Sequence, residues 1–251
     1  MPRPLPFVLA NSDHGALIVN QLDRAQDASG EQFGVGHQIM TRASFDMEEV
    51  ALTLGVLGDR RDTHGDGVVA LDGGANVGVF TIEWALEMTG WGEVVAFEPQ
   101  ERIFYALAGN VALANLFNAR ACWAALGAKS GRVLVPRPNY ARPGSFGSLE
   151  LRHGPATEFI GQAVSYEEEE MDVVQLVAVD DLALPRLDLL KLDVEGMELE
   201  ALAGARDTIT RLRPVLLVEW IKVGMPALAD LLTPLGYTLQ VVGLNVLGTP
   251  T

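Results

Sequence analysis

The stretch that decides the fold is a glycine-rich turn at residues 71–85, LDGGANVGVFTIEWA. The hydrophobic run that ends at Asp72 has the pattern of a buried strand, and the apolar residues after Gly78 recur at helical spacing. Glycines at 73, 74 and 78, with Asn76 among them, predict a turn whose backbone a ligand can approach closely. A carboxylate at the mouth of this turn would repel a pyrophosphate, so we expect a different ligand.

Strand-like and helical segments alternate from here to the C-terminus. Short hydrophobic runs bounded by turns predict buried strands at residues 67–72, 93–98, 119–126, 173–180, 188–193, 214–219, 237–242 and 245–250. Helical periodicity predicts helices at about 79–88, 104–114, 199–212 and 226–235. Buried strands that alternate with helices favour an α/β fold with a doubly wound, mostly parallel sheet.

Two segments depart from this alternation. Residues 1–65 contain one clear amphipathic helix, with apolar residues at i, i+3, i+4 and i+7 from Met47, and we expect them to form a small helical appendage or lid. Residues 66–251 are expected to form the ligand-binding domain. Within that domain, residues 135–171 are rich in proline and glycine, which is typical of a long functional loop. We therefore expect an insertion there that contacts the substrate and stays mobile until the substrate binds.

Composition limits the class of protein. The chain has 251 residues and is 49% hydrophobic, which suits one α/β domain with a sizeable core. Its net charge of −15 argues against nucleic-acid binding, because contact with phosphates needs clustered lysine and arginine. No apolar run approaches the ~20 residues that span a bilayer. Residues 1–15 lack the apolar core of a signal peptide and Cys122 is the single cysteine, so we expect a mature, cytoplasmic chain without disulfides.

Carboxylates close five of the predicted strands, and these are Asp72, Glu98, Asp180, Asp193 and Glu219. In a parallel sheet the carboxyl ends of the strands share one edge, where ligands bind. An edge lined with carboxylates suits a cation or a ligand rich in hydroxyl groups. The alternative is that these acids cap the helices that follow, and for Asp180 this alternative is at least as strong.

Glu98 ends the second strand of the first strand–helix–strand unit, where an acid accepts hydrogen bonds from a ribose diol. Nicotinamide-dependent enzymes share this device, so Glu98 alone does not identify the cofactor. The turn does, because Asn76 interrupts the G-x-G-x-x-G spacing of dinucleotide sites and Asp72 precedes the first glycine. An acid there would attract the ammonium and sulfonium groups of S-adenosylmethionine (SAM), which also carries a ribose diol.

Four motifs taken together resemble the FkbM-family methyltransferases, which are class I, SAM-dependent enzymes. The motifs are LDGGANVGVFT, VVAFEPQERIFYALAGNVALAN, LLKLDVEGMELEALAGA and PVLLVE, and the resemblance covers about residues 45–250. It departs from the family pattern at Gly73, where a hydrophobic residue is usual. The resemblance implies a Rossmann-like methyltransferase sheet with an antiparallel C-terminal strand. It also implies a small-molecule acceptor, such as a sugar or a secondary metabolite, that is methylated on a hydroxyl group.

The resemblance also implies a cofactor site, position by position. The glycine-rich turn and the end of a central strand would hold the methionine part of SAM, Glu98 the ribose, and backbone after the third strand the adenine. The residues implied to bind the cofactor are Asp72, Gly73, Gly74, Asn76, Gly78, Glu98, Pro99, Ala124, Ala125 and Asp193.

Methylation of a hydroxyl is helped by a base that takes the hydroxyl proton. Asp193 ends a central strand beside the glycine-rich turn and Glu195 begins the next helix, so we predict that one of them is this base or aligns the acceptor. Both could instead hold the cofactor or compensate the helix N-terminus, which is the role we expect for Glu198. His37, flanked by glycines, is a third candidate. We expect no metal site, although Glu219 and its neighbours are oxygen ligands of the kind that divalent cations use.

Three other classes share part of this pattern. An NAD(P)-dependent oxidoreductase would have the same sheet and Glu98, but Tyr105 and Tyr140 lack a lysine four residues later. A nucleic-acid methyltransferase is disfavoured by the acidic charge. A non-catalytic Rossmann-like binding protein would not need the acidic edge, and it predicts no SAM binding. The oligomeric state stays open.

Overall fold

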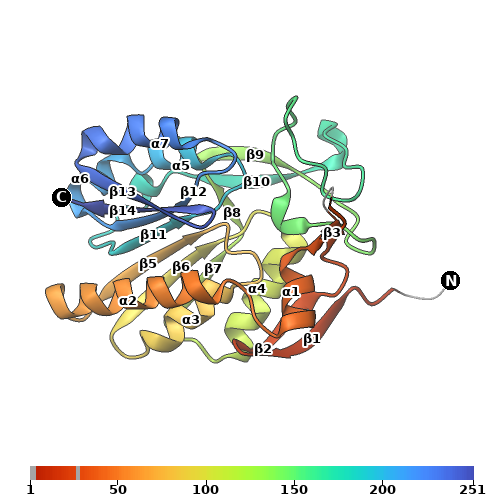
Figure 1. Cartoon of the computed structure of the whole chain (residues 1–251), viewed down its shortest axis with the longest axis horizontal. Coiled ribbons are helices and arrows are strands. Elements are labelled where there is room, and N and C mark those ends of the chain that lie inside the picture. Colours follow the sequence, from red (N-terminus) through yellow and green to blue (C-terminus); the bar gives the residue numbers. More distant parts are fainter. Residues whose placement is uncertain (1–3, 27–28) are drawn as a thin grey trace.

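A seven-stranded sheet lies between two layers of helices in the computed structural model of the chain, which describes residues 4–26 and 29–251 (Figure 1). The strands, in spatial order, are β13 (Tyr237–Val242), β14 (Asn245–Pro250), β12 (Val215–Glu219), β11 (Leu189–Leu192), β5 (Val68–Gly73), β6 (Gly92–Phe97) and β7 (Ala119–Cys122). Neighbours from β12 to β7 are parallel, and β14 runs antiparallel to β12 and β13. The predicted doubly wound sheet with an antiparallel C-terminal strand is confirmed.

Helices cover both faces of this sheet. One face carries α2 (Met47–His64), α3 (Val79–Glu87) and α4 (Glu101–Leu113), and the other carries α5 (Glu198–Ala203), α6 (Arg206–Leu212), α7 (Met225–Leu232) and the 3-10 helix η4 (Thr233–Leu235). Figure 1 shows α2 and α3 on the opposite side of the sheet from α5, α6 and α7. In the described part of the chain, no helix combines the length and the apolar character needed to cross a membrane.

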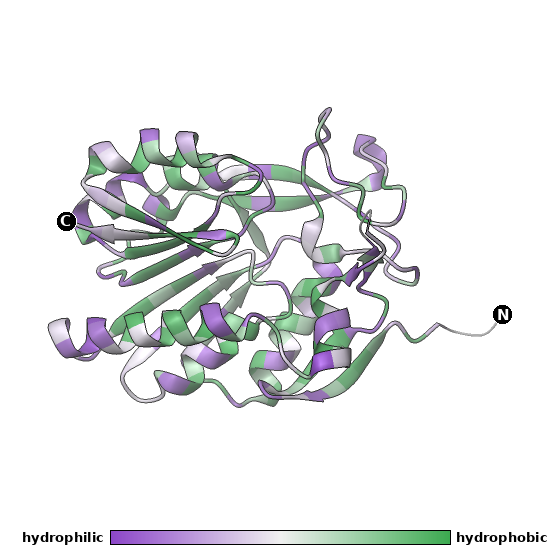
Figure 2. Ribbon diagram, in the orientation of Figure 1, coloured by the Kyte–Doolittle hydropathy of each residue, from purple (hydrophilic) through white to green (hydrophobic). Residues whose placement is uncertain are grey.

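Alternate residues of the central strands face the two helix layers. In β5, Val68 and Ala70 join the core beneath α2, α3 and α4, whereas Val69 and Leu71 join the core beneath α5, α6 and α7. Every residue of β5 is buried, which explains the continuous hydrophobic run of its first four residues. Figure 2 shows this concentration of hydrophobic residues along the central strands. Burial of each such side chain is worth about 1.5–3 kcal/mol, so both cores hold the strand ends in place.

The chain leaves the central sheet at Trp123. β7 ends before this residue, and β8 (Ala124–Leu126) begins after it in a separate sheet with β9 (Gly131–Pro136) and β10 (Met171–Val177), in the order β8-β10-β9. The predictions that 119–126 is one strand and that 173–180 lies in the central parallel sheet are therefore wrong. A hydrophobic run indicates a buried strand, but it does not specify which sheet the strand joins.

Asp180 lies away from the carboxylate edge, in the 3-10 helix η3 (Val179–Leu182). Its carboxylate accepts hydrogen bonds from the N–H groups of Asp207 and Thr208 at 3.1 and 2.7 Å. These two residues lie in the first turn of α6, so Asp180 does cap a helix, although not the one that directly follows it in the chain.

The described part of the N-terminal segment contains four strands and a second helix as well as the one helix that was expected. A hairpin of β1 (Phe7–Ser12) and β2 (Gly15–Asn20) and a short pair, β3 (Ala25–Gln26) and β4 (Gln32–Phe33), precede α1 (Val35–Arg42) and α2. The buried side chain of Asn110 in α4 bonds both backbone groups of Ile18 and donates to the carbonyl of Val77 at 2.8 Å. This side chain ties the hairpin to the glycine-rich turn. The domain boundary after residue 65 stays a prediction.

The insertion, residues 135–171, has little regular structure beyond strand ends and the 3-10 helices η1 (Phe146–Ser148) and η2 (Glu168–Glu170). Its middle is nevertheless anchored, because Phe146 is fully buried. The N–H of Phe146 donates to Asp23 at 2.9 Å, and its carbonyl accepts a hydrogen bond from Gln100 at 2.8 Å. These bonds hold η1 against the N-terminal segment and the loop that follows β6. The mobility of the insertion as a whole stays a prediction.

Candidate active site

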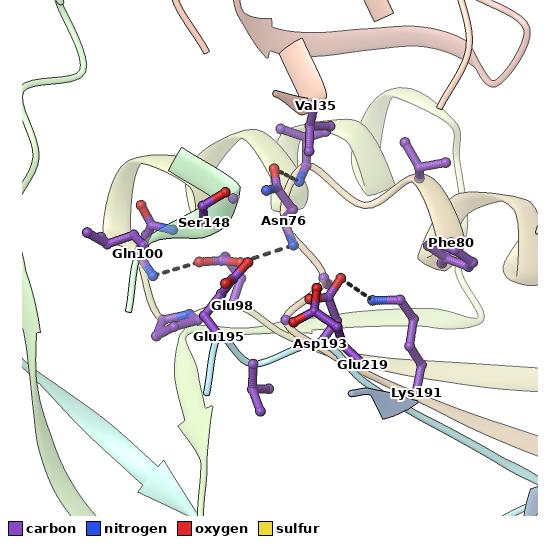
Figure 3. A pocket seen from close by; sticks show the side chains of 18 of the residues that line it. Val35, Asn76, Phe80, Glu98, Gln100, Ser148, Lys191, Asp193, Glu195 and Glu219 are labelled. Atoms are coloured by element: carbon purple, nitrogen blue, oxygen red, sulfur yellow. Dashed lines mark hydrogen bonds and ion pairs between the residues drawn. The ribbon is translucent and has the colours of Figure 1, made fainter. Parts of the chain in front are cut away.

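A cavity of about 310 Å³ lies at the carboxyl ends of the central strands (Figure 3). Gly74 follows β5, Glu98 follows β6, Asp193 follows β11, and all three line the cavity. The N-terminal segment contributes Val35 and other residues to the wall, and the insertion contributes Ser148. The predicted ligand-binding edge of the sheet is therefore the floor of a cavity that two further segments enclose.

Gly74 allows the turn after β5 to touch the end of β11. Its φ is 76°, and a Cβ on this residue would lie 1.8 Å from the carbonyl oxygen of Asp193. The N–H groups of Gly74 and Ala75 both donate to the carbonyl of Phe97 at the end of β6, at 3.0 and 2.9 Å. Asn76 continues the turn at a φ of 51°. Only glycine fits at position 74, because any side chain would force these two strand ends apart.

Glu98 is 3% exposed, and its carboxylate is held by backbone on both sides. One oxygen accepts the N–H of Asn76 at 3.0 Å and the other accepts the N–H of Gln100 at 2.8 Å. Burial nevertheless raises the pKa of Glu98 to about 7. Each oxygen keeps acceptor capacity beyond its one backbone bond, which is what a ribose diol would use.

Lys191 is the buried cation of the site. Its ammonium lies 3.2 Å from a carboxylate oxygen of Asp193, 3.8 Å from Asp72 and 4.9 Å from the ring centre of Phe80. Burial lowers the pKa of Lys191, but Asp193 and Asp72 outweigh it and the net pKa is raised. The other oxygen of Asp72 accepts the hydroxyl of Thr81 at 2.6 Å. Asp72 thus lies behind the cavity wall, where it balances the charge of Lys191.

Three further carboxylates converge on the same wall, and Figure 3 shows Asp193, Glu195 and Glu219 pointing into one region. Burial, with Asp193 adding to it, raises the pKa of Glu195 and raises that of Glu219 to about 7. Glu195 has a φ of 55°, which is unusual for a residue other than glycine. Its carboxylate is paired with the ammonium of Lys222, which is not part of the cavity wall.

Glu198 shapes the loop that carries Glu195. It is fully buried, and it accepts hydrogen bonds from the N–H groups of Val194 at 2.9 Å and Gly196 at 3.1 Å. The expected role at a helix N-terminus is thereby refined, because Glu198 begins α5 and binds the turn just before it.

The predicted site residues fall into two groups. Those that line the cavity are Gly74, Asn76, Glu98, Pro99, Ala124, Ala125, Asp193 and Glu195. Those that do not line it are Asp72, Gly73, Gly78 and His37. Their parts in binding and catalysis stay predictions.

Packing explains the position of the second group. A Cβ on Gly73 would meet Leu126 at 2.7 Å, and one on Gly78, which begins α3, would meet Leu107 at 2.6 Å. Both glycines therefore serve close packing behind the turn. His37 lies in α1, between residues that line the cavity, without lining it itself.

The N-terminal segment, expected to form an appendage or lid, supplies wall residues that the sequence did not single out. Asp46 precedes α2 at the N-cap position but makes no side-chain cap bond, and burial raises its pKa to about 6. Asp46 lines the cavity with Glu49 and with the rings of Phe33 and Phe45. An acid directly before an amphipathic helix was visible in the sequence, but it has the ordinary pattern of a helix cap. Within residues 4–26 and 29–251, no three His, Cys, Asp or Glu side chains are placed to hold a metal ion.

Comparison with known proteins identifies the family of this chain. Residues 72–239 match the model of the methyltransferase FkbM domain, which is more than half of the chain. The chain belongs to the FkbM methyltransferase family. Methyltransferase sdnD of Sordaria araneosa is 30% identical over 192 residues, which cover 67% of this chain and 73% of that protein.

A solved structure has a fold similar to that of this methyltransferase. The crystal structure of methyltransferase FkbM from Methylobacillus flagellatus KT matches with a TM-score of 0.50 at 18% identity. The match covers 73% of this chain and 43% of that one, so this chain spans less than half of the length of that relative. The methyltransferase depends on SAM, and the oxidoreductase and non-catalytic alternatives are not supported.

Proposed function

We propose that this methyltransferase methylates a hydroxyl group of a small molecule, such as a sugar or a secondary metabolite. The observation that carries the proposal is the pair of carboxylates, Asp193 and Glu195, on the cavity wall. They lie where the backbone of Gly74 packs directly against the end of β11. A hydroxyl must lose its proton when it is methylated, and a carboxylate in this place can accept that proton.

The cavity offers groups that fit SAM. The turn at Gly74 leaves no side chain between the ligand and the backbone, and Asp193 beside it presents a carboxylate that fits an ammonium group. Glu98 fits the ribose, and the small side chains of Ala124 and Ala125 leave room for a flat ring beside their backbone. When bound, SAM supplies a methyl group on a positively charged sulfur. The protein then has to bring the acceptor into line with that group and to take its proton.

The raised pKa of the acids supports this chemistry. A base works best when its pKa is close to the working pH. Burial moves the pKa of Glu195 upward and that of Glu219 to about 7, so both carboxylates are more basic than exposed ones. Either group suits the removal of a proton from a hydroxyl during methyl transfer.

The remaining wall supports a compact acceptor. Phe33, Phe45 and Phe80 present aromatic rings, and Asp46 and Glu49 present acceptors for hydroxyl protons. This mixture fits a molecule with an apolar body and several hydroxyls. The N-terminal segment therefore acts as the acceptor lid, and the insertion completes the wall.

The charge of the chain supports a small acceptor rather than a nucleic acid. With a net charge of −15, the protein lacks the excess of lysine and arginine that phosphate contacts require. The cytoplasmic location expected from the sequence stays a prediction.

Transfer of a labelled methyl group tests the proposal. The protein is incubated with SAM that carries a CD₃ group and with a panel of monosaccharides, polyhydroxylated polyketides, amines and short RNAs, and the products are analysed by mass spectrometry. We expect label on a hydroxyl oxygen of a sugar or a polyketide-like alcohol. Label found on nitrogen, carbon or RNA instead would contradict the proposal.

Two isosteric variants then separate chemistry from binding. We expect a loss of turnover of about 10²–10⁴-fold for at least one of Asp193→Asn and Glu195→Gln at saturating SAM, because general-base assistance has this magnitude. SAM affinity should change much less in that variant. Glu87→Gln, on the exposed end of α3, is the matched control. Wild-type turnover in both variants would move the base elsewhere, with Glu219 on the cavity wall as the next candidate.

A further inference from the structure

Lys222 lies in the loop between β12 and α7, where its ammonium contacts two segments that are far apart in the sequence. It pairs with Glu195 from the loop after β11. It also lies 3.5 Å from Glu150 and 3.6 Å from Glu158, and it donates a hydrogen bond to the carbonyl of Ser148 at 3.3 Å. These last three residues belong to the insertion.

The surroundings make the pair of Lys222 and Glu195 stronger than an ordinary surface pair. The side chain of Lys222 is 15% exposed and that of Glu195 is 19% exposed, so water screens their attraction poorly. Lys222 itself does not line the cavity, whereas Glu195 does. Lys222 therefore acts on the cavity through the carboxylate that it holds and through its hydrogen bond to Ser148, which also lines the cavity.

We propose that Lys222 is a positioning residue for methyl transfer, which fixes the carboxylate of Glu195 at the cavity wall and links that carboxylate to residues 148–158 of the insertion. Its importance for catalysis rests on the proposed function, in which Glu195 accepts the proton or aligns the acceptor. The link gives the insertion an effect on the reacting groups in addition to its contacts with the acceptor.

The sign of this coupling follows from the charges. Asp193 and Glu219 face Glu195 and raise its pKa, while the ammonium of Lys222 lowers it. Loss of the ammonium should therefore raise the pKa of Glu195 further. Glu150 and Glu158 share the same ammonium, so the loss of their charge should lower the pKa of Glu195. The phenol of Tyr166 bonds the backbone of Glu150 and is a further titratable group at this cluster, and the ring centre of His153 lies 5.0 Å from that of Tyr166.

Titration of Glu195 by NMR tests the proposal without an acceptor. The protein, saturated with S-adenosylhomocysteine (SAH), carries ¹³C at the glutamate carboxyl carbons, and Glu195→Gln assigns the signal. In Lys222→Met we expect the pKa of Glu195 to rise by about one unit or more, the usual effect of losing an opposite charge within ~4–6 Å. Lys222→Arg should restore the wild-type titration, and Lys129→Met, at an exposed lysine, should leave it unchanged.

A second variant decides the result even if Lys222→Met does not fold. In the double variant Glu150→Gln/Glu158→Gln, the pKa of Glu195 should fall. An unchanged titration in Lys222→Met, or an unchanged or raised pKa in the double variant, would overturn the role of Lys222. Because the titration needs no methyl transfer, a failure here is distinct from a failure of the proposed hydroxyl methylation, which the labelled products report.

Discussion

Replacement of Glu98 by glutamine should weaken the binding of the cofactor and should also remove the dependence of that binding on pH. The carboxylate of Glu98 accepts one backbone N–H on each oxygen, and it is almost fully buried. A glutamine can keep only one of these bonds, because its NH₂ group would face a second donor. The change therefore disturbs the turn at Asn76 or Gln100 and also removes the charged acceptor for the ribose.

The magnitude follows from the bond that is lost and from the pKa. A hydrogen bond to a charged group contributes about 1.5–3 kcal/mol, so we expect the affinity for SAH to fall by about 10–150-fold at pH 8. Burial raises the pKa of Glu98 to about 7, so the group loses its charge as the pH falls through neutrality. Its ionised fraction is about 0.9 at pH 8 and about 0.09 at pH 6, which predicts a wild-type affinity about tenfold weaker at pH 6.

Isothermal titration calorimetry with SAH at pH 8 and pH 6 measures both effects. Glu98→Gln should bind SAH weakly at both pH values. Its affinity should change little between pH 8 and pH 6, whereas the wild-type affinity falls about tenfold. Glu93→Gln lies on the same strand with an exposed side chain, and it should behave as wild type. The reasoning is refuted if Glu98→Gln keeps the wild-type affinity at pH 8, or if it shows the same loss between pH 8 and pH 6 as the wild-type protein.

Two further predictions concern one group at the site and one at the opposite end of the central sheet. Gly74→Ala would put a Cβ 1.8 Å from the carbonyl of Asp193, so we expect this variant to have a lower melting temperature and no SAH binding. The control is Gly55→Ala in α2, which has open space around it and should stabilise the protein by about 0.5–1 kcal/mol. Equal melting curves for the two variants would contradict this prediction. Asp188→Asn removes the buried negative charge that faces Arg60 at 3.1 Å and Arg186 at 2.7 Å and turns one accepting oxygen into a donor. It should cost about 3–5 kcal/mol in urea unfolding, whereas a loss below about 1 kcal/mol would show that these ion pairs are unimportant.

Glu98 shows how much of the site was predictable from the sequence. Its place at the end of a hydrophobic run, one strand after the glycine-rich turn, predicted its position on the ligand-binding edge. Asp193 was predicted in the same way, and both residues line the cavity. These predictions depend only on local periodicity and on the rule that parallel strands present their carboxyl ends at one edge.

Asp72 and Lys191 show what depends on register across the sheet. The sequence pointed to Asp72 as a direct contact of the cofactor, whereas the structure places it behind the cavity wall, against Thr81 and Lys191. Lys191 is the partner of Asp72 in the pairing of β11 with β5, so the two charges meet inside the protein. Their sequence positions are more than one hundred residues apart, and no local pattern records that pairing.

The sequence by itself therefore determined the central sheet, the glycine-rich turn and the acids that end the strands, because each is encoded within one strand, turn or helix. The tertiary structure alone decided that Asp46 and Phe45 close the cavity and that β10 belongs to a second sheet. It alone also joined Lys222 to Glu195 and to the insertion. These features are contacts between distant segments, and their free energy depends on how whole layers pack, which the hydrophobic pattern of any single segment does not specify.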